Sequence, residues 1–463
     1  MLLDDGMNIE LPNYFLADLP PGAPLTGKLI TEACQTLKRN REQYLQRRAT
    51  GQIIRVLAEV ARDWQEPENV FRRLALKLGP QELGFSEGTL ARGLDDFFAA
   101  ITAESLEHLL VQELGHPKRL DGPVATREEK LGTRAALAIG PELQAHITAG
   151  NIPNAALTSM VLGLLTRSAQ FVKCASGASL LPRLFAHSLY QADAKLSACL
   201  EVAEWPGGSE VLEGALFAEA DCVTATGTDE TLAAIRAKLP PRVRFLGYGH
   251  RVSFGYITQE ALSGHDVPEL AARAARDVTA WNQLGCLSPH VFYVERDGHV
   301  SGERFAAMLA EELERLERRE PRGEVSTEAA AAIANSRAMY AVRAAHIPDT
   351  KHWCSEGSTA WTVVFESDPR FQVSCLNRFI YVKEAGGLND VINGADMLHG
   401  QVSTVGVAAA AHQMPGIVER LARWGVTRVC PIGRMQSPPL AWRHDGRPPL
   451  ADLVRWVDWE QAE

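Results

Sequence analysis

The sequence lacks the features that mark several large classes of protein. No stretch approaches the roughly 18 consecutive apolar residues that a membrane-spanning helix needs, so no integral membrane segment is expected. Basic residues are in the minority, with 47 Lys and Arg against 57 Asp and Glu and a formal net charge of −10. A nucleic-acid-binding protein usually carries a basic excess or patch, so no nucleic-acid partner is expected.

The eight cysteines lack the spacing of a metal or redox site. They stand at positions 34, 174, 199, 222, 286, 354, 375 and 430, and no two form a CxxC pair. Neither a zinc site nor a redox dithiol is expected, and we predict no metal. The start, Met1 to Gly6, also lacks the basic residues of a signal peptide. We therefore expect a cytoplasmic protein, in which thiols stay reduced.

The chain is long and apolar enough for an enzyme of several domains. Its 463 residues are 46% hydrophobic and 22% charged, which suits two or three domains with substantial cores. In residues 53–64 and 94–114 the apolar positions recur at helical spacing and predict a helical N-terminal segment. We expect the apolar faces of these helices to pack in the core. The alternative is that they line a groove for a fatty chain.

From Arg134 onward, short β-rich runs alternate with helical stretches. The runs are 135–139, 170–173, 196–203, 221–225, 243–247, 290–295, 361–366 and 379–383. Such alternation is typical of parallel sheets with crossover helices. The predicted fold class is therefore α/β.

Cys286 stands where a reactive thiol is expected. It lies in Trp281-Asn-Gln-Leu-Gly-Cys-Leu-Ser-Pro289, between a helical stretch over 267–282 and an apolar strand that begins at His290. The small residue before it leaves the sulfur accessible. An inert buried cysteine is the alternative. Cys174 is the main rival nucleophile, because a lysine precedes it.

Three further segments occur in the chain order of the aldehyde dehydrogenase superfamily. One strand ends in Gly150-Asn-Ile-Pro153, the next ends at Lys173, and a third ends in Thr226-Gly-Thr228, all before the cysteine. The run 149–189, the turn 247–253, residues 286–289 and the turn His444-Asp-Gly446 resemble the long-chain acyl-CoA reductase family of the LuxC type. The resemblance extends from about residue 10 to the C-terminus.

The resemblance implies an aldehyde-dehydrogenase-like α/β fold with a Rossmann-type cofactor domain, an α/β catalytic domain and a helical N-terminal segment. We place the helical segment at 1–125, the cofactor-binding domain at 126–255 and the catalytic domain at 256–430. Residues 431–463 are expected to pack back on the cofactor domain or to form an oligomer interface.

The resemblance also implies a nicotinamide cofactor. Lys173 resembles the superfamily's ribose-binding lysine, and Ser176 stands where many relatives carry a glutamate. Because an acid would repel a 2′-phosphate and serine can accept one, NADPH is expected rather than NADH. A glycine turn that opens a helix offers backbone N–H groups to a phosphate. The remaining candidate cofactor-binding residues are Thr226, Gly227, Thr228 and Gly249.

The catalytic residues follow from the same resemblance. Asn151 occupies the position of the superfamily's oxyanion-binding asparagine, although a plain turn residue before Pro153 is the alternative. A thiolate at Cys286 exchanges with an acyl thioester at little net cost. No carboxylate stands in residues 247–256, where aldehyde-oxidising relatives carry a glutamate base. The acyl-enzyme is therefore expected to be reduced rather than hydrolysed.

Some assignments remain open in the sequence. The superfamily glutamate that holds the nicotinamide ribose has two candidates, Glu366 and Glu384. His250 is either an orienting or a structural residue. The turn His444-Asp-Gly446 resembles a site motif, but such turns are more often structural or interfacial, since no nucleophile or metal pattern stands beside it.

The sequence thus predicts NADPH-dependent reduction of a fatty acyl thioester, either acyl-CoA or acyl-protein, to the aldehyde. The resemblance further implies an acyl-activating or acyl-transferring partner enzyme and a homo-oligomer. One alternative is a reductase of short-chain or amino-acid-derived acyl thioesters. Another is an acyltransferase that uses the same cysteine without redox chemistry, and a third is a catalytically silent acyl-binding subunit.

Overall fold

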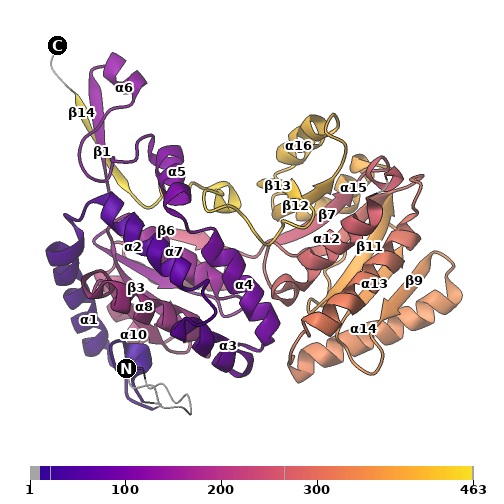
Figure 1. Cartoon of the computed structure of the whole chain (residues 1–463), viewed down its shortest axis with the longest axis horizontal. Helices are drawn as coiled ribbons and strands as arrows, with labels where there is room; N and C mark the ends of the chain where they lie inside the picture. Colours follow the sequence, from indigo (N-terminus) through magenta and orange to yellow (C-terminus); the bar gives the residue numbers. More distant parts are fainter. Residues whose placement is uncertain (1–10, 21, 265, 461–463) are drawn as a thin grey trace.

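The computed structural model describes residues 11–20, 22–264 and 266–460. The N-terminal residues considered above for a signal peptide lie outside this range. Two lobes follow one another along the chain (Figure 1), the first built on a five-stranded sheet and the second on a seven-stranded sheet. Among the described helices, none has the length and apolar character required to cross a membrane.

Helices cover the first lobe before its sheet begins. They are α1 (Gly27–Asn40), a π-helical turn (Arg41–Leu45), α2 (Thr50–Asp63), α3 (Val70–Leu83), α4 (Glu87–Ala99) and α5 (Ala103–Leu114). Ser86 and Thr102 cap α4 and α5 by accepting a hydrogen bond from a first-turn N–H. Ile53, Leu94 and Phe98 are buried in one core with residues of the sheet and its helices. The predicted core faces are confirmed.

The five-stranded sheet is parallel throughout. Its strands are β2 (Leu143–Ile147), β3 (Ala169–Cys174), β4 (Leu200–Glu204), β5 (Cys222–Thr226) and β6 (Arg244–Tyr248), in the order β4-β3-β2-β5-β6. The connecting helices are α7 (Asn154–Leu165), α8 (Leu180–Ala192), α9 (Ala194–Ser197), α10 (Glu210–Glu219) and α11 (Asp229–Lys238). The carboxyl ends of all five strands therefore lie along one edge.

One predicted strand is partly wrong. The run 196–203 was expected to be extended, but its first residues belong to α9. The carboxylate of Asp193 accepts a hydrogen bond from the backbone N–H of Leu196 and starts this short helix. The strand β4 begins only at Leu200.

The seven-stranded sheet forms the second lobe. Its strands are β7 (Val252–Ile257), β8 (Pro289–Glu295), β9 (Thr350–Cys354), β10 (Thr362–Glu366), β11 (Phe379–Ala385), β12 (Val402–Ala408) and β13 (Arg428–Pro431), in the order β13-β12-β7-β8-β11-β10-β9. All neighbours are parallel except β9 and β10. The helices of this lobe are α12 (Val267–Thr279), α13 (Gly302–Arg319), α14 (Thr327–His346), α15 (Leu388–Gly394) and α16 (Met414–Arg423).

The chain passes from one sheet to the other between Tyr248 and Val252, a few residues before the expected boundary at 255. The C-terminal segment then crosses back to the first lobe (Figure 1), where the guanidinium of Arg244 donates to the carbonyls of Asp452 and Val454 at 2.8 Å each. It ends in β14 (Arg455–Glu460), which pairs with β1 (Arg134–Ile139) in an antiparallel ribbon.

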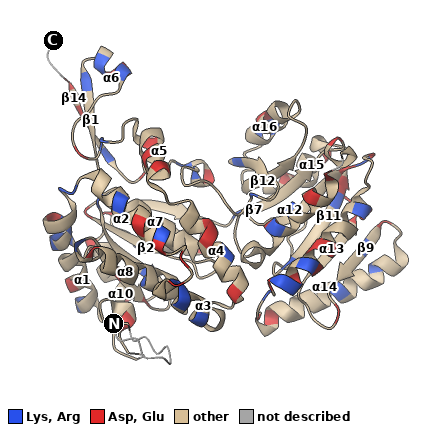
Figure 2. Ribbon diagram, in the orientation of Figure 1, with Lys and Arg blue, Asp and Glu red and all other residues tan. Residues whose placement is uncertain are grey.

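This ribbon projects from the first lobe together with the short helix α6 (Arg127–Leu131) (Figure 1). Every residue of β14 is exposed, including Trp456 and Trp459. Elsewhere, charged residues of both signs are interspersed on the helices of both lobes (Figure 2). That mixture agrees with the minority of basic residues in the sequence.

Glu201 is a carboxylate held inside the first lobe. Its Oε1 accepts hydrogen bonds from the backbone N–H groups of Leu16 (2.7 Å) and Val202 (3.0 Å). Burial nevertheless raises the pKa of Glu201 from the usual 4.5 to about 7, with the nearby Asp18 adding to the increase. The folded protein therefore prefers this group protonated.

Replacement of Glu201 by Gln tests this buried charge. Because the folded-state pKa is raised, the stability contributed by Glu201 is present below pH 4.5 and is lost as the pH rises through about 7. A glutamine keeps the oxygen acceptor without the charge, so Glu201→Gln should raise the Tm at pH 8.5 by about 2–4 °C. Near pH 4 the two proteins should melt at nearly the same temperature, because Glu201 is then mostly protonated in both the folded and the unfolded state. An equal Tm difference at both pH values would contradict the assignment.

Candidate active site

Two sheet edges face each other where the lobes meet. The first sheet contributes the carboxyl ends of its strands, and the second contributes the amino ends of β7, β8 and β12, since only residues 249–251 separate β6 from β7. Cys286 lies in the turn immediately before β8. The predicted nucleophile and the predicted cofactor residues therefore come from opposite sides of one seam.

The loop that carries Cys286 begins with an unusual backbone turn. Trp281, Asn282 and Gln283 all have positive φ values, of 49°, 50° and 67°, and each costs about 1 kcal/mol relative to a right-handed conformation. A second left-handed turn at residues 376–378 packs against it, and the N–H of Asn377 donates to the carbonyl of Asn282 at 2.9 Å. Strain of this kind persists only where the surroundings impose it.

Buried side chains lock the two turns together. The guanidinium of Arg378, which is fully buried, donates to the side-chain oxygen of Asn282 (3.1 Å) and to Glu317 (2.7 Å). The amide of Gln283 donates to the carbonyls of Pro289 (2.7 Å) and Phe379 (3.0 Å). These contacts hold the loop rigidly on the second sheet.

Further contacts fix the residues next to the thiol. The hydroxyl of Ser253 donates to the carbonyl of Cys286 at 2.7 Å and accepts from the N–H of Thr404 at 3.1 Å. The amide of Gln436 donates to the hydroxyl of Ser288. A Cβ at Gly285 would collide with that same amide. A larger residue before the cysteine would therefore have to displace the Gln436 amide from Ser288.

The predicted oxyanion residue reaches the cysteine loop. The side-chain amide of Asn151, in the loop after β2, donates a hydrogen bond of 2.9 Å to the carbonyl of Leu284, two residues before Cys286. Asn154, which could be confused with it in the sequence, instead donates to the carbonyl of Gly93 at 3.3 Å. The structure thus brings Asn151, and not Asn154, to the nucleophile across 133 positions of chain.

The thiol of Cys286 is half-buried, and the groups around it shift its pKa in opposite directions. Burial raises its pKa to about 12, and the carboxylate of Asp445 adds to the increase. The backbone N–H of Cys286 and the guanidinium of Arg251 act in the opposite direction. Burial is therefore the main obstacle to a thiolate, and Asp445 and Arg251 modify it in opposite directions.

Asp445 was not assigned a role in the sequence, but the C-terminal turn carries it to the nucleophile. Its side chain lies 3.7 Å from Nε of Arg251 and accepts from the hydroxyl of Ser403 at 3.3 Å. A carboxylate from the C-terminal turn therefore lies beside residue 251, in a segment that has none of its own. No local pattern could have indicated this, because Arg251 and Asp445 lie far apart in the chain.

The histidines near the seam differ in role. The ring of His444 stacks on Tyr248 with a centroid distance of 4.4 Å, and burial lowers its pKa. His290 is buried, its pKa is lowered to about 4 mainly by burial, and its Nδ1 accepts from the N–H of Ser374 at 3.1 Å. Both rings are therefore neutral at neutral pH, whereas His250 is exposed in the turn between the sheets.

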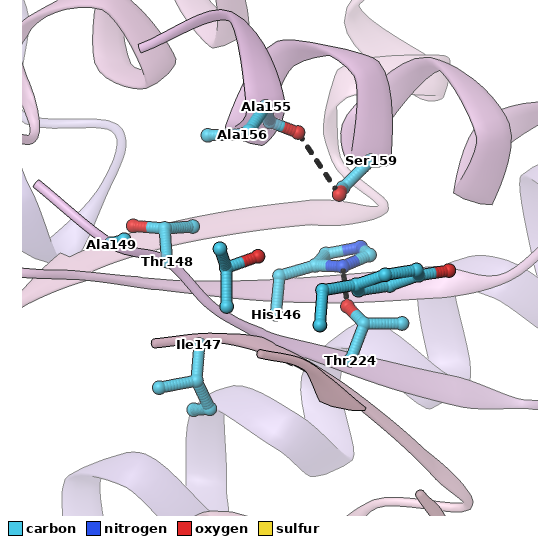
Figure 3. Close-up of a pocket in the computed structure, with 10 residues that line it drawn as sticks. His146, Ile147, Thr148, Ala149, Ala155, Ala156, Ser159 and Thr224 are labelled. Atoms are coloured by element: carbon cyan, nitrogen blue, oxygen red, sulfur yellow. Dashed lines mark hydrogen bonds between the residues drawn. The ribbon is translucent and has the colours of Figure 1, made fainter. Parts of the chain in front are cut away.

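A small pocket lies at the carboxyl ends of β2 and β5, where the order of the first sheet reverses. It is lined by Ala149, Ala156, Thr226 and Tyr248, together with the residues that Figure 3 labels. His146 and Thr224 point toward each other there, with Nδ1 and Oγ1 2.6 Å apart (Figure 3). In open α/β sheets this position is the usual site of a nucleotide.

Lys173 and Ser176 lie at the same sheet edge. Lys173 is the last residue but one of β3 and is 4% exposed, with its ammonium group 5.8 Å from the ring centroid of Trp205. Burial lowers its pKa. Ser176 follows in the loop before α8. Lys173 and Ser176 suit the ribose of a dinucleotide. They provide a cation and a hydroxyl at the edge of the sheet where the strand order reverses between β2 and β5.

The turn at Thr226 to Thr228 is less open than expected. The N–H of Gly227 donates to the carbonyl of Tyr248 at 3.2 Å, and the hydroxyl of Thr228 caps α11 by accepting from Thr231 N–H at 3.3 Å. A Cβ at Gly249 would collide with the carboxylate of Asp229. The N–H of Gly227 is therefore already paired, whereas phosphate binding by the other N–H groups of this turn stays a prediction. A side chain at position 249 would have to displace the Asp229 carboxylate.

Neither candidate for the nicotinamide-ribose glutamate reaches the seam. Glu366 binds Lys383 at 2.9 Å and Arg343 at 2.7 Å, and Glu384 lies 3.9 Å from Arg296. Both glutamates stand near the carboxyl ends of β10 and β11, which run parallel to β8, whereas Cys286 precedes the amino end of β8. They therefore lie at the opposite edge of the sheet.

The rival cysteine is also excluded by its surroundings. Cys174 is completely buried in β3, and burial raises its pKa to about 12. The same is true of Cys222 in β5. Only Cys286, Cys354 and Cys375 are partly exposed among the eight, and of these only Cys286 lies at the seam.

The fold and the cysteine at the junction of two sheets define an aldehyde-dehydrogenase-like enzyme. NADP-dependent glyceraldehyde-3-phosphate dehydrogenase from Bacillus halodurans C-125, solved with NADP, is similar with a TM-score of 0.68 and 15% identity, over 95% of this chain and 92% of that one. Indole-3-acetaldehyde dehydrogenase, solved with NAD+, gives 0.69 and 13%, over 94% and 89%. At these identities the likeness concerns the fold.

Within that class, residues 45–456 match the family model for acyl-CoA reductase (LuxC), and the chain belongs to this family. A long-chain acyl-protein thioester reductase of Aliivibrio fischeri is 24% identical over 89% of this chain and 82% of its own length. One from Vibrio harveyi is also 24% identical, over 68% of this chain and 64% of its own length. The match thus spans slightly under two thirds of the Vibrio protein.

The charge balance at Cys286 can be tested by alkylation. An asparagine at 445 keeps an oxygen acceptor for Ser403 and tolerates the positive φ of 51° found there. With the negative charge removed, Asp445→Asn should lower the thiol pKa and speed modification of Cys286 by iodoacetamide at pH 8 roughly tenfold. Peptide mass spectrometry identifies the modified residue.

Asp458→Asn provides the matched control, because Asp458 is exposed on β14. It should leave the alkylation rate unchanged, and Arg251→Met should slow it. If Asp445→Asn and Asp458→Asn react at the native rate, the electrostatic role of Asp445 is refuted.

Proposed function

We propose that this enzyme reduces a fatty acyl thioester, acyl-CoA or acyl-protein, to the aldehyde through an acyl group bound to Cys286, with NADPH as the reductant. The observation that carries the proposal is the contact of the Asn151 amide with the Cys286 loop, at the seam that also borders the nucleotide pocket. Membership of the acyl-CoA reductase family supports the reaction class. The names of the similar proteins, long-chain acyl-protein thioester reductases, support the fatty acyl substrate.

An apolar region beside the seam supports a fatty acyl chain as part of the substrate. A second pocket, which shares Ala149 and Ala156 with the first, is lined by Leu83, Phe85 and Ile152. Phe85 and Ile152 also belong to a small apolar cluster with Trp281 and Leu284, which are residues of the cysteine loop. Apolar lining at this position suits the hydrocarbon end of an acyl thioester.

The acylation step needs only the chain's own residues. The sulfur of Cys286 attacks the thioester carbonyl carbon, the bond from that carbon to the donor sulfur breaks, and the donor leaves as a free thiol that takes up the proton. Arg251 favours the thiolate required for attack, and Asp445 opposes it. One thioester replaces another, so the exchange is close to neutral in energy.

Reduction then releases the aldehyde. A nicotinamide dinucleotide held beside Lys173 and Ser176 would supply the hydride that the acyl carbon accepts. The amide of Asn151 and the backbone N–H of Cys286 are the donors available to the resulting oxyanion, which collapses with expulsion of the Cys286 thiolate. Lys173 and Ser176 would hold the ribose end, and the choice of NADPH rests on the absence of an acid at position 176.

The remaining parts of the proposal concern the setting of the enzyme. We include a cytoplasmic location, a homo-oligomer and an acyl-activating or acyl-transferring partner enzyme. The projecting ribbon of β1 and β14, with the exposed Trp456 and Trp459, supports the oligomer, because exposed apolar side chains often mark interfaces.

The first test measures NADPH consumption with a long-chain acyl-CoA and identifies the aldehyde. The native chain should turn over, and Cys286→Ala should lose activity completely, because the acyl-enzyme then cannot form. Cys354→Ala is the control, since Cys354 is also partly exposed but lies on β9. If radiolabelled acyl attaches to Cys286 while NADPH stays unchanged, an acyltransferase without redox chemistry replaces the proposal.

Asn151→Ala tests the oxyanion donor. Loss of one such donor costs about 3–4 kcal/mol in the transition state, so kcat should fall by roughly 10²–10³-fold. Asn154→Ala, which removes an asparagine from the same segment, should change kcat far less. Comparable losses in the two variants would show that the segment matters only for folding, and circular dichroism of both proteins provides the check.

A further inference from the structure

A carboxylate lies beside the ribose residues, on a strand that the sequence did not connect with them. Glu204 ends β4 and is the register partner of Cys174, so it stands at the same sheet edge as Lys173. Its Oε1 accepts a hydrogen bond of 2.8 Å from the N–H of Gly177, in the loop that carries Ser176. The acid missing at position 176 is therefore replaced by one from the neighbouring strand.

The surface around Glu204 is open to a ligand. Gly177 has a φ of +74°, and a Cβ placed there would meet no atom within 4 Å. The same is true of Gly207 and Gly208, in the loop that follows Glu204. Backbone without side chains on two adjacent loops leaves room for a sugar and its substituents.

Lys173 supplies a second, independent observation. Its ammonium group is buried, and among the described carboxylates none forms an ion pair with it. The charges of Glu213 and Glu204 partly offset the effect of burial on its pKa. A buried cation without a paired anion is costly unless a ligand supplies polar partners.

We propose that Glu204 determines how strongly the enzyme discriminates between a 2′-phosphate and a 2′-hydroxyl on the cofactor ribose. The inference rests on the proposed nicotinamide-dependent reduction. A carboxylate at the end of a Rossmann strand accepts hydrogen bonds from ribose hydroxyls, whereas a 2′-phosphate placed there meets a like charge. Ser176 and Lys173 favour the phosphate, and Glu204 opposes it. The native enzyme therefore prefers NADPH less strongly than it would without the charge of Glu204.

Glu204→Gln tests this directly. Glutamine retains an oxygen for the N–H of Gly177 and removes the charge. The ratio of kcat/KM for NADPH to that for NADH should rise about tenfold, the size expected when one nearby like charge is lost. Calorimetry without acyl substrate should show the dissociation constant of NADPH falling by a similar factor, with little change for NADH.

Two variants control the interpretation. Glu210→Gln makes the same change of net charge at an exposed site in the first turn of α10 and should keep the native ratio. Glu204→Asp keeps the negative charge and should also keep the native ratio of kcat/KM for the two dinucleotides. If both dinucleotides bind and Glu204→Gln retains the native ratio, the role of Glu204 is refuted while the reductase proposal stands. If neither dinucleotide binds the native chain, the reductase proposal itself fails.

Discussion

Three residues, Gly249 to Arg251, connect the carboxyl end of β6 to the amino end of β7. So short a connection leaves the two sheets no freedom to separate, and it forces the carboxyl edge of the first to face the amino edge of the second. A parallel sheet collects its loops at its edges. The loops of β2, β3 and β5 therefore meet the loop of Cys286 at one seam, and the rest of the site depends on this arrangement.

The loop of Cys286 is fixed in position, but its surroundings do not favour ionisation of the thiol. Two left-handed turns, hydrogen bonds from Ser253 and Gln283, and the close approach of Gln436 fix the loop. The same packing removes water from the thiol and raises its pKa. The packed site thus disfavours the thiolate, and such opposition between packing and ionisation is common where strain and charge meet at a functional site.

Two segments that lack an acid in the sequence have a carboxylate from another segment beside them in the structure. No acid stands at 176, yet Glu204 reaches its loop, and none stands in 247–256, yet Asp445 lies beside Arg251. In both cases the carboxylate comes from a segment far along the chain or on the next strand. A segment that lacks an acid can still lie beside one, because a folded site draws its charges from every element packed around it.

Local pattern determined much of this protein. Periodicity predicted the N-terminal helices, α12, α11, most strands of the first sheet and β8, β10 and β11 of the second, since helical spacing, turns and apolar runs act over a few residues. It missed β7, β9, β12 and β13. The context of Cys286 predicted that it is the nucleophile. Pattern did not indicate β14, whose residues are all exposed, or the partners of Glu366 and Glu384. Tertiary structure alone decided which side chains meet at the seam. Contacts such as Asn151 with Leu284 depend on how two separately formed sheets pack, and no short stretch of sequence carries that information.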